Sequence, residues 1–278
     1  MDFTIFSTNI KKNKNYILIY ISQMENKLIY ESKKVVKSYS KKNNLTPPEK
    51  SILEQMKKNN IDSMLDIGVG TGRTTSHFGK IASKYIGIDY SEKMIEICKE
   101  KFNYLSNFSF STCDARNMSI FSDNSFDFVL FSFNGIDCVS FEDRIFIIKE
   151  IKRVLKPNGY FSFSSHNIYN IPKLFSFQFP KNPLKYYAEF IRCQKVKKLN
   201  QSKNNLLNMN YAMIKDGDIN FSTEYCYCKP EYLVSQLTSF NFINITPFYL
   251  KTGEIILSNQ SFNLINDSWI YFLCQNNK

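Results

Sequence analysis

The 278-residue chain lacks the sequence patterns of several common protein classes. Its seven cysteines are odd in number and include no C-x-x-C pair, which argues against a structural zinc site. No apolar run reaches the ~18 residues that span a bilayer. The short run YILIYI at 16–21 follows lysines and has no small-residue cleavage site, so no signal peptide is expected. We therefore expect a reduced, cytoplasmic protein with no bound metal and no membrane partner.

What the chain does contain is apolar and aromatic residues in the proportions of a folded protein. Hydrophobic residues make up 43% of it and aromatic residues 15%, enough for one large domain with a possible subdomain. The net charge is +11, which raises the possibility of an RNA partner. The lysine clusters are scattered, as in KKNK at 11–14 and KVKK at 195–198, and this favours compositional bias over one RNA-binding face.

From residue 61 onward, apolar runs alternate with helical periodicity. Such alternation predicts right-handed crossovers and a parallel sheet covered on both faces, hence an α/β fold. The predicted strands are 62–69, 84–90, 107–114, 125–133, 160–165, 242–250 and 268–275, and the predicted helices are 48–58, 73–83, 91–105, 141–155, 184–198 and 229–240. The last two strands are expected to form an antiparallel pair at one edge of the sheet.

The pattern predicts four segments. Residues 1–60 form an N-terminal extension with helices, and 61–166 form the nucleotide-binding core. Residues 167–222 interrupt the alternation with Phe, Asn, Lys and three prolines, and are expected to form a lid over the end of the sheet. Residues 223–278 complete the core sheet. Aromatic residues of the lid either line an acceptor pocket or build the lid's own core; they are Phe175, Phe177, Phe179, Tyr186 and Tyr187.

A glycine turn, LDIGVGTGR at 65–73, follows the first core strand. Glycines let the backbone approach a ligand, and the helix that follows offers free N–H groups. The spacing Asp66-x-Gly68-x-Gly70-x-Gly72 departs from the G-x-G-x-x-G of dinucleotide sites. Asp66 would repel a pyrophosphate and attract an ammonium group, directly or through water. An NAD-dependent oxidoreductase is therefore disfavoured.

Carboxylates also follow the next two strands. Asp89, 21 residues after Gly68, stands where a carboxylate accepts both hydroxyls of a ribose. Asp114 ends the third strand and is placed to accept from the amine of a purine. We expect these two and Asp66 to lie in register at one sheet edge. A ligand with an amine, a ribose and an adenine but no phosphate is S-adenosylmethionine.

At this point the chain resembles the class I S-adenosylmethionine-dependent methyltransferases. LDIGVGTGR, YIGIDYSEKMIEICKEKF, CDAR, SFDFVLFSFNGID and EIKRVLKPNGYFSFSSHN are similar to that superfamily's successive motifs, over about residues 36–166, and the likeness returns at 225–275. The resemblance implies a Rossmann-like, mostly parallel seven-stranded sheet with an antiparallel edge strand. It also implies that Gly68, Gly70 and Arg73 contact the methionine part of the cofactor and that Asp89 binds its ribose. Tyr90, Asp114 and Ala115 would border the adenine, and the backbone of Phe131 would contact the cofactor.

The acceptor side is less defined. Methyl transfer needs alignment, and a base where the acceptor is protonated. His166, after the fifth strand, is the candidate base, with a loop-bonding histidine as the alternative. Tyr39 is a candidate for closing over the cofactor, with packing as the alternative. Asn134 and Asp137, in FNGID, are candidates for binding the acceptor, with a turn as the alternative.

Two absences bear on the acceptor. Methyltransferases that act on nucleobase amines resemble one another in an NPPY-like tetrapeptide after the fourth strand, and this chain has none there. It also has no Pro-Cys dipeptide, which is part of the signature of enzymes that methylate cytosine C5. The sequence therefore predicts methyl transfer to an O or N atom of a small molecule. An RNA methyltransferase and a non-catalytic S-adenosylmethionine-binding protein stay as alternatives.

Overall fold

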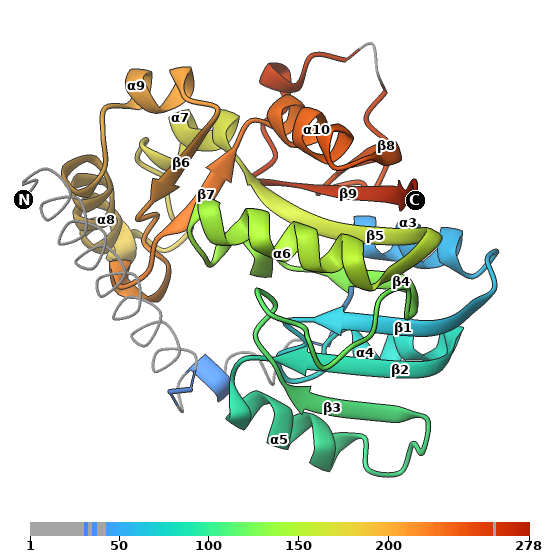
Figure 1. Cartoon of the computed structure of the whole chain (residues 1–278). Coiled ribbons are helices and arrows are strands. Elements are labelled where there is room, and N and C mark those ends of the chain that lie inside the picture. The colour runs from blue at the N-terminus through green and yellow to red at the C-terminus, as the bar shows by residue number, and fades with distance from the viewer. Residues whose placement is uncertain (1–30, 33–34, 38–42, 258–259) are drawn as a thin grey trace, which may run out of the picture.

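The computed structural model describes residues 31–32, 35–37, 43–257 and 260–278 (Figure 1). A sheet of nine strands forms the centre of this part of the molecule. The strands are β1 (Ile61–Ile67), β2 (Ala82–Asp89), β3 (Phe108–Thr112), β4 (Phe126–Phe131), β5 (Leu155–Asn167), β6 (Tyr211–Ile214), β7 (Tyr225–Cys228), β8 (Phe242–Tyr249) and β9 (Trp269–Asn276). Five of them run parallel in the order β3-β2-β1-β4-β5.

The predicted antiparallel pair closes one edge of this sheet. β9 runs antiparallel to β5, and β8 runs antiparallel to β9. The predicted fold class is confirmed, but the sheet has nine strands where seven were expected. The two additional strands are β6 and β7, a hairpin that pairs with the last two residues of β5, His166 and Asn167. β5 extends beyond the predicted strand at both ends: Leu155 pairs with Phe126 of β4, and His166 and Asn167 pair with β7.

Helices cover both faces of the sheet. The apolar core on one face includes residues of α6 and α10, and the core on the other includes residues of α3, α4 and α5. Figure 1 shows α6 in front of the sheet and α3 and α4 behind it. The bounds are α3 (Pro47–Met56), α4 (Thr75–Phe78), α5 (Glu92–Lys101), α6 (Phe141–Val154), α7 (Ile171–Leu174), α8 (Tyr186–Leu199), α9 (Lys203–Asn208) and α10 (Pro230–Ser239).

The helix predicted over 73–83 is much shorter. α4 ends at Phe78, a single 3₁₀ turn follows, and β2 begins at Ala82. A Cβ atom at Gly79 would lie 2.2 Å from the ring of Phe108, so only glycine lets the chain pass this close to β3. The chain therefore leaves the helix through a 3₁₀ turn, at a residue that packs closely on Phe108, earlier than the sequence pattern indicates.

The three predicted aspartates are staggered along the sheet edge rather than in register. Asp66 pairs with Gly87, two residues before Asp89, and Asp89 pairs with Thr112, two residues before Asp114. Each step of two residues is about 7 Å along a strand. Asp66 is consequently the deepest of the three carboxylates, and Asp89 lies at the end of its strand.

The inserted segment has a small apolar core of its own, built by Ile168, Ile171, Phe175, Val196, Leu206, Ala212, Ile214, Tyr225 and Tyr227. Of the five aromatic residues predicted to line a pocket or to build a lid core, Phe175 belongs to this core. Phe179 and Tyr187 are exposed instead, at 80% and 76%. The insert lies at the end of the sheet where the parallel strands terminate (Figure 1).

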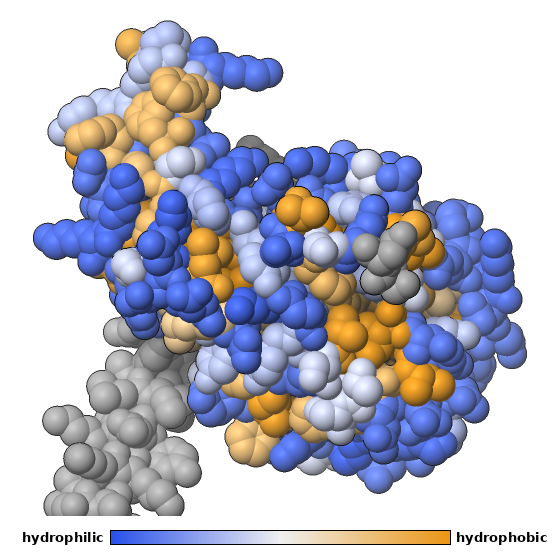
Figure 2. Space-filling view, turned by 90° about the horizontal axis from the view of Figure 1, so that it is seen from above, coloured by the Kyte–Doolittle hydropathy of each residue, from blue (hydrophilic) through white to orange (hydrophobic). Residues whose placement is uncertain are grey.

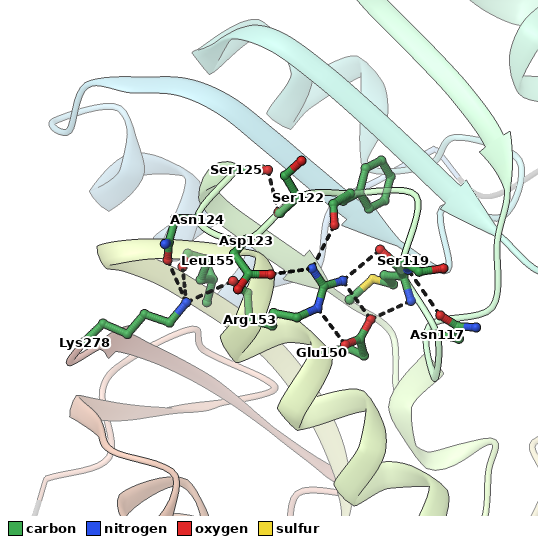
Figure 3. A network of polar contacts seen from close by, with 12 residues as sticks. Asn117, Ser119, Ser122, Asp123, Asn124, Ser125, Glu150, Arg153, Leu155 and Lys278 are labelled. Atoms are coloured by element: carbon green, nitrogen blue, oxygen red, sulfur yellow. Dashed lines mark hydrogen bonds and ion pairs between the residues drawn. The ribbon is translucent and has the colours of Figure 1, made fainter.

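The chain between Asp114 and β4 is fastened to α6 by Arg153 (Figure 3). Its guanidinium donates to the carbonyls of Met118 and Phe121 at 2.9 and 2.8 Å, and to Glu150 and Asp123. Glu150 in turn accepts the N–H of Met118, and the Arg153 hydrogen bonds lower the pKa of Glu150. This network fixes the segment that follows Asp114.

Candidate functional site

The glycine turn adopts the backbone conformation that its sequence predicts. Gly68, Gly70 and Gly72 have φ angles of +64°, +55° and +79°, a region that side chains other than hydrogen disfavour. A Cβ atom at Gly72 would lie 2.4 Å from the Phe102 ring, and one at Gly68 would lie 3.0 Å from the Phe131 ring. The turn is therefore packed so closely that glycine is required at these positions.

Asp66 is buried near the end of β1 and holds the residues around this turn through hydrogen bonds. It is 1% exposed, and its Oδ2 accepts from the hydroxyls of Thr74 and Tyr85, both at 2.6 Å. Burial raises its pKa to about 6, although both hydrogen bonds act in the opposite direction. Its contacts tie β1 to the start of α4 and to β2. Attraction of a cofactor ammonium by Asp66 stays a prediction, because the side chain is engaged within the core.

Asp89, the last residue of β2, lies beside the glycine turn. Its Oδ2 accepts the N–H of Gly70 at 2.9 Å, and its Oδ1 accepts the N–H of Ser91 at 2.9 Å. Burial raises its pKa to about 6 against these backbone hydrogen bonds. A carboxylate offers about four lone-pair positions, so acceptor capacity remains for a ribose hydroxyl. Binding of the ribose by Asp89, and of the methionine part by the glycine turn, stays a prediction.

The residues predicted to border the adenine lie beyond β2 and β3. Tyr90 and Ala115 are partly buried, and Ala115 packs against the main core. Asp114 is held by Arg116, whose Nη2 lies 2.5 Å from Asp114 Oδ2. Burial alone would raise the pKa of Asp114, but the hydrogen bonds from Arg116 outweigh it and lower the pKa. Arg116 therefore competes with an adenine amine for this carboxylate.

Arg73 is paired with a residue that the sequence analysis did not select. Its two terminal nitrogens donate to Glu49 of α3 at 2.7 and 2.5 Å. Glu49 is fully buried and also accepts the N–H of Thr46 at 2.7 Å and the hydroxyls of Ser132 and Tyr271. Burial alone would raise the pKa of Glu49, but its donors outweigh this and lower it. The predicted pairing of Arg73 with the methionine carboxylate would have to compete with Glu49.

Beyond β4 and β5, three predicted acceptor-side residues meet. His166 Nδ1 lies 2.8 Å from Asp137 Oδ2, which also accepts the His166 backbone N–H at 2.7 Å. Asp137 further accepts from Ser165, and it forms a fully buried ion pair with Arg144. A carboxylate accepts hydrogen bonds, so this contact is consistent with the tautomer of His166 that carries its hydrogen on Nδ1 and leaves Nε2 as an acceptor.

Asn134 completes this group. Its Nδ2 lies 3.3 Å from His166 Nε2, which is consistent with Nε2 as the acceptor. Its side-chain oxygen, Oδ1, is buried and has no hydrogen-bond partner among the described residues. Asn134 and the preceding Phe133 both have positive φ, +60° and +57°. An unpaired buried acceptor costs about 1–3 kcal/mol, so a ligand that donates a hydrogen bond here would recover that energy.

Asp137 has a different role from the predicted one. Its side chain is fully buried and all its hydrogen bonds go to the protein, so it positions His166 and does not itself present a surface to an acceptor.

A line of aromatic contacts joins the two halves of the site. Arg73 lies over the Phe133 ring at 4.7 Å, Phe133 packs edge-on against Trp269 at 4.7 Å, and Trp269 meets His166 at 6.0 Å. His166 also stacks on Tyr227 at 4.6 Å. Aromatic faces stabilise a neighbouring cation such as a sulfonium. These contacts link Arg73, at the end of the glycine turn, to His166.

Residues 64–159 match the family model described as "Methyltransferase domain". The core is a class I methyltransferase domain. This class uses S-adenosylmethionine, so the predicted cofactor is confirmed.

The curated relatives of this methyltransferase domain include two demethylmenaquinone methyltransferases. That of Staphylococcus aureus (strain JH9) is 34% identical over 134 residues, which are 45% of this chain and 54% of the relative. That of Staphylococcus haemolyticus (strain JCSC1435) is 39% identical over 98 residues, 34% of this chain and 39% of the relative. The chain thus spans about half the length of these relatives or less.

Solved structures show the same fold over most of the chain. The 1,6-didemethyltoxoflavin-N1-methyltransferase of Burkholderia thailandensis superposes with a TM-score of 0.58 at 12% identity, covering 93% of this chain and 89% of its own. An S-adenosylmethionine-dependent methyltransferase of Clostridium acetobutylicum gives 0.56 at 15% identity, covering 83% and 91%. At these identities the likeness establishes the fold of the chain and nothing beyond it.

Some residues of the candidate site could have been found in the sequence. Glu49 stands three residues after the predicted helix cap Thr46, the spacing of a capping box, and its side chain accepts the Thr46 N–H as in that motif. Trp269 is the chain's one tryptophan. Nothing in the sequence marks Phe133. Tyr39 lies outside the described residues, and His77 contacts the carbonyl of Asn43 at 3.1 Å.

Other kinds of site find no support in the described ranges. No group of three or more metal-ligating side chains occurs among the described residues. Cys226 and Cys228 point the same way from β7 and are buried, with their sulfurs 3.6 Å apart. None of the helices in the described part of the chain is long and apolar enough to cross a membrane.

Proposed function

We propose that the chain transfers the methyl group of S-adenosylmethionine to an oxygen or nitrogen atom of a small-molecule acceptor, with His166 as general base. The observation that carries this proposal is the hydrogen bond between His166 Nδ1 and buried Asp137, which leaves Nε2 as the proton acceptor beside Asn134. The relatives named as demethylmenaquinone methyltransferases support a small molecule as the acceptor class.

On the cofactor side, Asp89 would bind the ribose hydroxyls, and the backbone of Gly68 and Gly70 would pass along the methionine part. Bound there, S-adenosylmethionine supplies an electrophilic methyl group on a sulfonium. Phe133 and Trp269, which join the glycine turn to His166, would offer aromatic faces to that positive charge. Residues 167–222 would act as the lid that selects the acceptor.

His166 would act on the acceptor's proton. As the acceptor's O or N atom forms its bond to the methyl carbon, the carbon–sulfur bond breaks and its electron pair stays on sulfur. The acceptor's hydroxyl or amine would displace the Asn134 Nδ2 hydrogen bond from His166 Nε2 and pass its proton to that nitrogen. The imidazolium formed would be stabilised by Asp137 through Nδ1. Asn134 Oδ1 would accept a second hydrogen bond from the acceptor and orient it.

The test is a measurement of S-adenosylhomocysteine release with a panel of phenols, hydroxyquinones and amines, and with RNA. Once an acceptor is found, His166→Gln should lower kcat by about 10²–10⁴-fold with the cofactor Kd unchanged. The matched control is His77→Gln, which alters the other histidine and should leave kcat unchanged. A kcat for His166→Gln within twofold of the control would remove His166 as the base.

The same panel separates the alternatives. Turnover of RNA but of no small molecule would contradict the proposed acceptor class. Cofactor binding without turnover of any acceptor would contradict catalysis and favour a non-catalytic S-adenosylmethionine-binding protein.

A further inference from the structure

The loop 177–185 and helix α8 expose an unusual amount of apolar surface. Leu184 is 89% exposed, Phe179 is 80% exposed and Tyr187 is 76% exposed. Phe177, Phe179 and Tyr186 contact one another through their rings, at 5.0 to 6.3 Å between centroids. Figure 2 shows orange side chains among blue ones on a projection at the upper left, the side on which Figure 1 places α8. We call residues 177–199 the arm.

The exposed groups of α8 share one side of the helix. At 100° per residue, Tyr186, Tyr187 and Phe190 lie within an arc of about 100°, and Lys197 and Lys198 continue the same stripe. The buried residues of α8, Cys193 and Val196, lie beside this stripe on one flank of the helix. The helix therefore contacts the protein through this narrow strip and leaves its aromatic and basic stripe exposed.

The charge of this region is strongly positive. Residues 173–203 contain eight lysine or arginine residues and one glutamate, a net +7 of the chain's +11. The single glutamate, Glu189, is paired with Arg192 at 2.8 Å, so neither of these two adds to the outward charge. This segment therefore carries a large share of the chain's net positive charge.

A groove beside the arm brings basic and apolar side chains together. Its volume is about 350 Å³, and its lining residues are Pro172, Phe175, Ser176, Lys197, Ser202 and Lys203. Two ammonium groups and two hydroxyls next to an apolar wall can bind a phosphate that carries a hydrocarbon chain.

We propose that the arm is a docking surface for a membrane that contains anionic phospholipids. Exposed Phe, Tyr and Leu gain free energy by entering the acyl boundary, and flanking lysines are attracted to anionic head groups. Leu184 favours lipid over RNA, because an aliphatic side chain gains from burial in hydrocarbon but offers no ring for a base to stack on. This proposal replaces the expectation of no membrane partner with binding at the membrane surface, and it is independent of the proposed methyl transfer.

The experiment measures sedimentation of the full chain with vesicles of phosphatidylcholine, with and without roughly 30% phosphatidylglycerol. An apolar variant carries Phe179→Ser, Leu184→Ser and Tyr187→Ser, and its matched control carries Tyr104→Ser, Ile120→Ser and Leu264→Ser, which are 73%, 60% and 76% exposed elsewhere. A charge variant carries Lys181→Gln, Lys185→Gln and Lys198→Gln, and its matched control carries Lys50→Gln, Lys58→Gln and Lys84→Gln. Circular dichroism and the thermal midpoint verify that each variant is folded.

We expect the wild type to bind the anionic vesicles more tightly than the neutral ones. The charge variant should lose affinity on the order of a hundredfold, at about 1 kcal/mol per lysine, and the apolar variant at least about tenfold, while both controls retain binding. Absence of vesicle binding, or equal losses in variants and controls, would overturn the proposal. So would binding of single-stranded RNA but not of vesicles, or a dimer that the apolar variant dissociates.

Discussion

Replacing Glu49 with glutamine should lower the free energy of unfolding by about 3 kcal/mol. Glu49 is the buried centre of a network that joins α3 to the glycine turn through Arg73, to the end of β4 through Ser132 and to β9 through Tyr271. Its side chain is 0% exposed and that of Arg73 is 11% exposed. Glutamine keeps the shape of the side chain but removes its charge and one of its two acceptor oxygens.

The size of this loss of stability follows from the buried charge of Arg73, which the substitution leaves without its charged partner. Breaking a buried ion pair by removing one partner costs about 3–5 kcal/mol, because the other charge stays buried without compensation. Glutamine retains one oxygen that accepts from Arg73, so we expect the lower end of this range. A matched control lies on the same helix: Glu54 is 66% exposed and pairs with Lys57, 50% exposed, at 2.6 Å. Glu54→Gln should cost about 0–1 kcal/mol.

Urea unfolding of the two variants and the wild type measures this difference. With a slope of about 3 kcal/mol/M, the midpoint of Glu49→Gln should fall by about 1 M and that of Glu54→Gln by much less. Since the pKa of Glu49 is lowered from 4.5 in the folded state, the stabilisation is complete above about pH 4.5 and is lost as the pH falls below it. Equal midpoints for the two variants at pH 7 would refute the reasoning.

Two further predictions concern the glycine turn. Because burial raises the pKa of Asp89 to about 6, and a protonated carboxyl accepts ribose hydroxyls poorly, S-adenosylmethionine should bind about tenfold more weakly at pH 5 than at pH 8. Calorimetry at the two pH values that gives equal affinities would contradict this. Gly72→Ala should destabilise the fold by about 2–4 kcal/mol, since it combines a φ of +79° with a Cβ atom 2.4 Å from the Phe102 ring. Adding Phe102→Leu should restore part of the loss in thermal unfolding, and no recovery would show that the ring is not the cause.

The fold was largely predictable because it depends on local patterns. Alternating apolar runs and helical periodicity located the strands and helices of the core to within a few residues, and the glycine spacing with Asp89 indicated the cofactor. The short α4 was not predictable, because Gly79, which follows its last residue, packs closely on Phe108, 29 residues later in the chain.

The acceptor side was only partly predictable for a similar reason. The sequence selected His166, Asn134 and Asp137 separately, and the structure brings them together across β4 and β5. It could not indicate that Asp137 is buried behind His166, because that depends on Arg144, which comes from α6. The capping-box spacing marks Glu49, but the sequence could not indicate its contacts with Arg73, Ser132 and Tyr271, which come from three distant segments.

The most direct test of the account is calorimetry of the purified chain with S-adenosylmethionine, S-adenosylhomocysteine and NAD. We predict binding of the first two and none of NAD. Asp89→Ala should weaken that binding by about 2–4 kcal/mol, roughly 30- to 800-fold, through the loss of the ribose hydrogen bonds. Asp62→Ala, an exposed carboxylate near the opposite end of β1, is the matched control and should bind like the wild type. Binding of NAD alone, or unchanged affinity in Asp89→Ala, would contradict the account.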